Sequence, residues 1–147
     1  MRHLFLTLLL VMGAFAFAAC GHDDNHPAND HAHGDAAGAT LTLNDGKKWQ
    51  ADQHTNDAMA GIGKALAEQP ATTTEELNAL GRELKTRVDA LVQGCTMTGP
   101  EHQQLHVFLE EFIPAVQHLA AETDHAKARQ AHQQVSHLAE EYGKHFE

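Results

Sequence analysis

Residues 73–94 read TTEELNALGRELKTRVDALVQG and carry the local signals of one amphipathic helix. Thr73 and Glu76 have the spacing of a capping box, in which each side chain accepts a hydrogen bond from the other residue's backbone N–H. Apolar residues then recur at intervals of three and four on one face: Leu77, Leu80, Leu84, Val88 and Leu91. Gly94 follows as a helix stop. A helix of this kind buries its apolar face, so the segment predicts packing against other helices.

Apolar residues at helical spacing also mark residues 48–68, a segment that opens at Thr98, and residues 124–145. The inward positions are Asp52, Thr55, Met59, Ile62 and Leu66 in the first segment, Leu105, Leu109, Phe112, Val116 and Leu119 in the second, and Ala128, Ala131, Val135, Leu138 and Tyr142 in the third. Thr98 and Glu101 repeat the capping-box spacing, and Pro114 is expected to kink its helix. The connections are short, so the sequence predicts an all-α fold, an up-down-up-down four-helix bundle over residues 41–147.

The N-terminal residues MRHLFLTLLLVMGAFAFAAC have the form of an export signal, with Arg2, an apolar run and small residues before a cysteine. The ending FAAC resembles a bacterial lipobox. It predicts that residues 1–19 are a lipoprotein signal peptide and that Cys20 is the lipidation site; an ordinary secretory signal is the alternative. Lipidated Cys20 would anchor the protein facing the periplasm, with the outer membrane favoured over the inner.

Residues 20–40 are rich in Gly, Ala, Asp, Asn and His and show no apolar periodicity, which predicts a flexible tether. Its histidines could collect metal ions weakly, or the tract could be only a spacer, and the sequence leaves both open. The chain has a formal net charge of −10. That charge argues against nucleic-acid binding and favours cations as partners.

The stretch CTMTGPEHQQLH, residues 95–106, concentrates side chains that bind metals. If Cys20 carries lipid, Cys95 has no partner for an intramolecular disulfide, and an unpaired thiol in an exported protein suggests a function. His102 and His106 share one helix face, a spacing at which two imidazoles can bind one ion. With Met97 they form a set of sulfur and nitrogen donors. The set predicts a copper site, with zinc or nickel as alternatives.

The expected topology adds candidates from the same end of the bundle. Asp52, His54 and Trp49 lie near the start of the first helix, and His145 lies near the end of the last. Asp52 is expected to orient a ligand imidazole, although a carboxylate favoured by the helix dipole is the alternative. Trp49 would keep water from the ion, and His54 and His145 would be further ligands.

Three histidines, His118, His125 and His132, belong to the opposite end and are expected on the surface, with a second, weaker metal site as the alternative. His137 and Glu141 are expected to form an exposed pair one helical turn apart.

Two segments, LTLNDGKKW (residues 41–49) and CTMTGPEHQQLHVFL (residues 95–109), together resemble those of small bacterial exported helical-bundle proteins of the lipoprotein type. That largely uncharacterised group has a CxM…HxxxH segment, carried here by Cys95, Met97, His102 and His106. The resemblance covers about residues 41–119. It implies a periplasm-facing bundle and no particular reaction.

The sequence therefore predicts a membrane-anchored periplasmic protein that binds copper for sequestration, delivery or sensing. No set of nucleophile, general base and oxyanion donors can be assembled, so an enzyme is not expected. A copper electron-transfer protein is one alternative. Another is a non-metal envelope interaction or chaperone-like module that binds a protein partner in an apolar groove. Non-covalent haem held by a methionine and a histidine is a weaker alternative.

Overall fold

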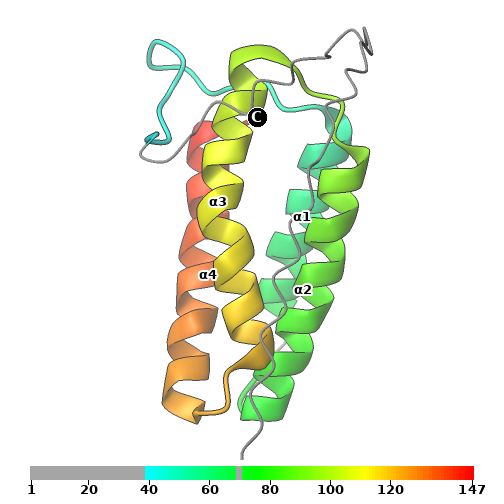
Figure 1. Ribbon diagram of the computed structural model, residues 1–147, viewed down its shortest axis with the longest axis vertical. Coiled ribbons are helices and arrows are strands. Elements are labelled where there is room, and N and C mark those ends of the chain that lie inside the picture. The colour runs from blue at the N-terminus through cyan, green and yellow to red at the C-terminus, as the bar shows by residue number, and fades with distance from the viewer. Residues whose placement is uncertain (1–38, 69–70) are drawn as a thin grey trace, which may run out of the picture. The chain divides into compact units, whose positions relative to one another are not determined.

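The computed structural model describes residues 39–68 and 71–147. In these ranges the chain forms four helices and no strand: α1 Gln53–Glu68, α2 Thr74–Gly94, α3 Gly99–Ala121 and α4 His125–His145 (Figure 1). The all-helical fold is confirmed, and the arrangement is consistent with a four-helix bundle. The predicted signal peptide, Cys20 and nearly all of the predicted tether lie outside the described residues. None of the described helices combines the length and apolar character needed to span a membrane.

The apolar stripes read from the sequence form the core. All five predicted inward residues of α2 are buried, as are all five in α3 and all five in α4. In α1, Thr55, Met59 and Ile62 are buried as predicted, but Leu66, and Asp52 just before the helix, are partly exposed, and Ala65 is buried in place of Leu66. Aromatic rings close the core toward the C-terminus, where Tyr142 stacks on Phe146 with ring centroids 4.8 Å apart. The Tyr142 hydroxyl also donates a hydrogen bond to Asn56 Oδ1 at 2.8 Å, which ties α4 to α1.

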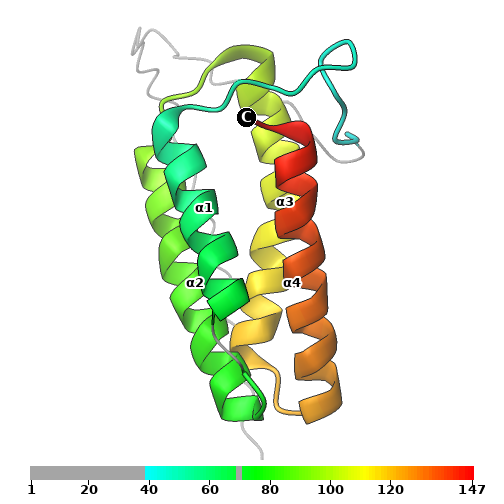
Figure 2. The same cartoon turned by 180° about the vertical axis from the view of Figure 1, so that it is seen from behind.

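The start of α1 and the end of α4 are joined by backbone hydrogen bonds. The Trp49 N–H donates to the His145 carbonyl at 2.7 Å, and the Glu147 N–H donates to the Trp49 carbonyl at 2.9 Å. Because these residues pair in extended backbone, α1 begins at Gln53 and not near residue 48 as predicted. Both helix ends therefore lie at one end of the bundle, together with the α2–α3 connection (Figure 2).

One of the two predicted capping boxes forms. At α2, the Thr73 hydroxyl accepts from the Glu76 N–H while the Glu76 carboxylate accepts from the Thr73 N–H, as predicted. At α3, the Thr98 side chain makes no capping hydrogen bond, so that prediction is wrong. The reason is Gly99, the first residue of α3, whose φ of +73° turns the backbone where the helix begins. Farther along, α3 continues through Pro114 to Ala121.

Helices α2 and α3 touch backbone to backbone at Gly81. A Cβ atom on Gly81 would lie 2.5 Å from the Ala120 nitrogen and 2.8 Å from the Leu119 carbonyl carbon. No side chain fits between the helices at this point, so the glycine permits an approach that any other residue would prevent. Toward the other end of α2 the two ribbons separate (Figure 1).

Replacing Gly81 with alanine should force α2 and α3 apart. We expect Gly81→Ala to lower the free energy of unfolding by about 1–3 kcal/mol, because the added methyl meets backbone that cannot rotate away. Urea unfolding followed by circular dichroism measures this loss.

Gly63→Ala is the matched control, since a Cβ on Gly63 meets no atom of the described residues within 4 Å. That variant should be more stable by about 0.5–1 kcal/mol, the usual gain from alanine over glycine inside a helix. Equal stabilisation of both variants would contradict the close helix contact.

Candidate metal centre

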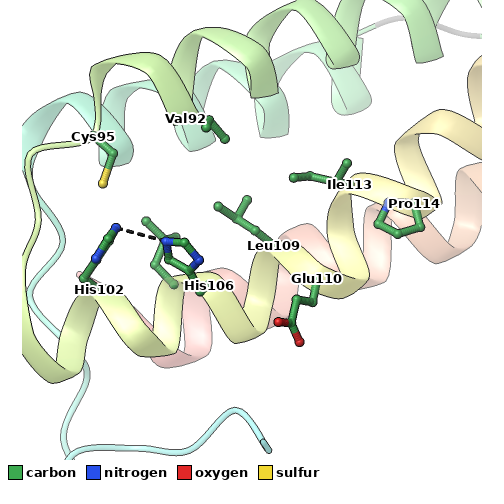
Figure 3. Close-up of a pocket in the computed structure, with 9 residues that line it drawn as sticks. Val92, Cys95, His102, His106, Leu109, Glu110, Ile113 and Pro114 are labelled. Atoms are coloured by element: carbon green, nitrogen blue, oxygen red, sulfur yellow. Dashed lines mark hydrogen bonds between the residues drawn. The ribbon is translucent and has the colours of Figure 1, made fainter. Parts of the chain in front are cut away.

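A groove of about 340 Å³ lies between α2 and α3 at the end of the bundle where their ribbons separate. Val92 and Cys95 line it from the α2 side. The α3 side contributes seven residues: His102, Leu105, His106, Leu109, Glu110, Ile113 and Pro114. Figure 3 shows apolar side chains along its length and the thiol and imidazoles at one end. Three of the four predicted metal ligands therefore share one groove.

The two imidazoles face each other across one turn of α3. His102 Nε2 lies 3.1 Å from His106 Nε2, and the rings meet edge to face with centroids 4.5 Å apart. In a tetrahedral site with metal–nitrogen bonds of about 2.0–2.1 Å, two ligand nitrogens lie about 3.3 Å apart. The pair is thus within a few tenths of an ångström of the spacing that one ion requires.

The protonation of His102 suits metal binding. Partial burial lowers the pKa of His102 below its ordinary value of 6.5, the neighbouring His106 lowers it further, and the Glu101 carboxylate opposes both. A lowered pKa keeps the imidazole neutral at pH 7, and only neutral imidazole has a lone pair free for a metal.

Cys95 faces the histidines from the opposite wall. It is a free, half-buried cysteine at the C-cap of α2, and its sulfur points toward the His102 ring (Figure 3). Among residues 39–68 and 71–147, no three His, Cys, Asp or Glu side chains converge closely enough to hold an ion. The His pair is therefore preformed, whereas the thiol shares the groove without completing a cluster.

Met97 does not line the groove. Its side chain is 9% exposed and packs in the hydrophobic core. The thioether predicted as a fourth ligand thus serves as a core side chain here. The preference for copper over zinc consequently depends on the Cys95 thiol alone.

Asp52 caps α1 and clamps the α2–α3 connection. Its Oδ1 accepts from the Thr55 N–H at 2.7 Å, and its Oδ2 accepts from the Thr96 N–H at 2.6 Å and the Thr96 hydroxyl at 2.7 Å. Desolvation raises the pKa of Asp52, but these hydrogen bonds outweigh it and hold the pKa well below the ordinary 3.8. Both oxygens are engaged by threonines, so Asp52 positions the residue next to Cys95 and does not orient an imidazole as predicted.

The remaining candidates lie at the same end of the bundle without lining the groove. His54 Nε2 is 3.0 Å from the Ala90 carbonyl oxygen, and its ring occupies the space that a Cβ on Gly94 would fill. Trp49 Nε1 donates to the Thr42 carbonyl at 2.5 Å and its ring packs against the core. His145 Nδ1 lies 2.9 Å from the Glu141 carbonyl oxygen. Each of these side chains has a structural role.

The histidines expected on the opposite surface differ from one another. His118 Nε2 pairs with Glu122 Oε2 at 2.9 Å, and His137 Nε2 lies 3.8 Å from Glu141 Oε1, as expected for exposed pairs. His132 is partly buried, its Nε2 has no hydrogen-bond partner among the described residues, and desolvation lowers its pKa below 6.5. His132 is therefore less exposed than predicted, because this position flanks the buried Ala131.

Sequence reasoning missed the apolar part of the groove. Val92 is 50% exposed, and Ile113 is partly buried. Both directly follow a stripe residue, Leu91 and Phe112 respectively. An apolar residue next to the buried stripe was the sequence signal that could have indicated a partly exposed apolar surface.

Asp52→Asn should weaken the clamp, because the new amide N–H₂ would face the Thr96 N–H donor. We expect the free energy of unfolding at pH 7 to fall by about 1–2 kcal/mol. The folded-state pKa of Asp52 is lowered, so its stabilisation is present above about pH 4 and is lost as the pH falls below that value. Denaturant unfolding at several pH values should thus show wild type and variant converging in acid.

Asp57→Asn is the control, because Asp57 is exposed on α1. It should change stability by less than about 0.5 kcal/mol. A similar loss in both variants would mean that general surface charge, and not the Thr55 and Thr96 hydrogen bonds, explains the effect.

Comparison of the chain with protein-family models, with curated proteins and with solved structures finds no match. The resemblance to exported lipoprotein-type bundles therefore stays an expectation from the sequence.

Proposed function

We propose that the chain is an exported up-down-up-down four-helix bundle, lipid-anchored through Cys20, that binds a copper ion in the groove between α2 and α3, with zinc or nickel as alternatives. Hydrogen bonds that join the start of α1 to the end of α4 and to the α2–α3 connection support the helix order. The export signal and lipobox support the periplasmic location.

The observation that carries the proposal is the 3.1 Å separation of the His102 and His106 Nε2 atoms. At this distance one Nε2–H donates to the other Nε2 in the metal-free protein, and a cation could bind both nitrogens once that ring carries its proton on Nδ1 instead. Cys95, on the opposite wall, is the third donor. A thiolate with two imidazoles forms a set that suits copper and also zinc.

Binding for sequestration or delivery fits this arrangement better than turnover. The groove that contains the His pair and the Cys95 thiol opens to solvent where Val92 and His106 are exposed, so an ion bound there would be accessible from outside. An ion held in this way can leave by ligand exchange. The net charge of −10 raises the local concentration of cations.

One observation favours a second function. The groove is mostly apolar, and Val92 is half exposed at its edge. An apolar groove on a helical bundle can bind an apolar segment of a partner protein without metal. In that case Cys95 and the two histidines would be incidental to partner binding.

Replacing both groove histidines should remove one tightly bound ion per chain. We expect His102→Ala/His106→Ala to weaken copper(I) binding by about 100-fold or more, because the chelating pair is lost. Competition titration against a coloured copper(I) chelator measures affinity and stoichiometry. Cys95→Ser should weaken copper(I) binding more than zinc(II) binding, since the thiolate is the soft donor.

The control is His125→Ala/His137→Ala, which removes two exposed histidines from α4. It should leave the tight ion in place and lower only weak binding. Equal losses in the two double variants would assign the metal to scattered surface histidines and would end the proposal.

The affinity for metal should depend on pH in a specific direction. Because the pKa of His102 is lowered from 6.5, the imidazole is already neutral at pH 7, and affinity should change little through this residue between about pH 7 and 8. Affinity should fall as the pH drops below 6.5 and protons compete for Nε2. A zinc titration at several pH values, run with the Cys95→Ser variant to remove the thiol, checks this. A steep loss between pH 8 and 7 would contradict it.

A further inference from the structure

The proposed site lacks a fourth ligand, and the inference below rests on that site. His102 and His106 form a preformed pair and Cys95 lines the same groove, but in residues 39–68 and 71–147 no three His, Cys, Asp or Glu side chains converge closely enough to hold an ion. An ion bound by these side chains would need a further donor, and the groove is the space from which that donor can approach. The molecule that occupies the groove would therefore supply the ligand that completes the coordination of the ion.

The groove selects for an apolar donor. Leu105, Leu109, Ile113 and Val92 line the space next to the imidazoles. A carboxylate, or a water with its hydration shell, would lose hydrogen bonds on entering this space. Among protein metal ligands, the methionine thioether is itself apolar, flexible and soft, so it fits both the lining and the ion.

The described part of the chain cannot supply this thioether. Its methionines, Met59 and Met97, are 5% and 9% exposed and both pack in the core. Releasing either one would leave a cavity in the core and destabilise the fold. A thioether from a partner avoids that cost.

The charge around the groove indicates the partner's character. Glu110 lines the groove and is exposed, Glu101 lies beside His102, and the chain as a whole carries −10. We propose that a partner protein inserts a methionine side chain, carried on a basic segment, into this groove, where the sulfur completes the coordination of the bound copper ion.

Two short synthetic lysine-rich peptides test this. One contains a single methionine, and the other has norleucine at that position, which matches its length and apolar character without sulfur. Fluorescence anisotropy with the full chain, with and without bound copper(I), measures their affinities. We expect the methionine peptide to bind the copper-loaded chain about tenfold or more tightly than the norleucine peptide, with no difference when copper is absent.

Two single substitutions on α2 locate the binding surface. Val92→Lys places a positive charge in the groove and should weaken binding of the methionine peptide about tenfold, compared with wild type when both chains are saturated with copper(I). Gln93→Lys adds the same charge at the next, exposed position, which does not line the groove. It should have little effect.

The outcomes separate this inference from the proposed function. Copper uptake with equal affinity for both peptides, or with no peptide binding, overturns the inference and leaves the metal site standing. Equal loss in Val92→Lys and Gln93→Lys overturns the placement in the groove. Absence of copper uptake in a direct titration overturns both proposals.

Discussion

The backbone contact of α2 with α3 at Gly81 is the constraint on which the groove depends. At Gly81 there is no space even for a Cβ atom between the glycine and Leu119 and Ala120. Packed helices cross at an angle, so two helices that touch at one point must separate farther along. About three turns along α2, the separation is wide enough for a groove of about 340 Å³ beside Val92 and Cys95. The contact of α2 with α3 at Gly81 and the groove beside Val92 and Cys95 both result from the way these two helices cross.

A second constraint holds the open end in place. The Asp52 carboxylate accepts hydrogen bonds from the backbone N–H and the hydroxyl of Thr96 while it caps α1. Residues 49–51 also form backbone hydrogen bonds with residues 145–147. Three segments distant in sequence are thereby fixed around the α2–α3 connection. Cys95 lies next to Thr96, so the clamp limits how far the thiol can move relative to α3. A donor held in this way loses less conformational freedom when it binds an ion.

The chemistry of the groove follows from its partial burial and its mostly apolar lining. Burial and a neighbouring imidazole keep His102 neutral, and apolar side chains from both helices disfavour hydrated donors. Neutral nitrogen, sulfur and an apolar lining all favour a soft ion over a hard one such as magnesium. Met97 contributes to the core instead, so the softness of the site comes from Cys95.

Much of the architecture could be read from local patterns. Apolar spacing predicted the helices and their inward residues because periodicity is a local property of the chain, and the Thr73–Glu76 capping box formed because its partners are three residues apart. The same spacing failed at Thr98, where the backbone of Gly99 intervenes. The start of α1 was misplaced because residues 49–51 find their hydrogen-bond partners at the far end of the chain.

The sequence by itself determined four amphipathic helices and the His102–His106 pair, since one helical turn brings those imidazoles together wherever the helix lies. Only the tertiary structure decided that Cys95 faces the pair and Met97 does not, that Asp52 clamps Thr96, and that Val92 and Ile113 line a groove. These relations depend on how far apart and at what angle α2 and α3 pack. That geometry is set by a contact between residues 81 and 120, which no local pattern in the chain encodes.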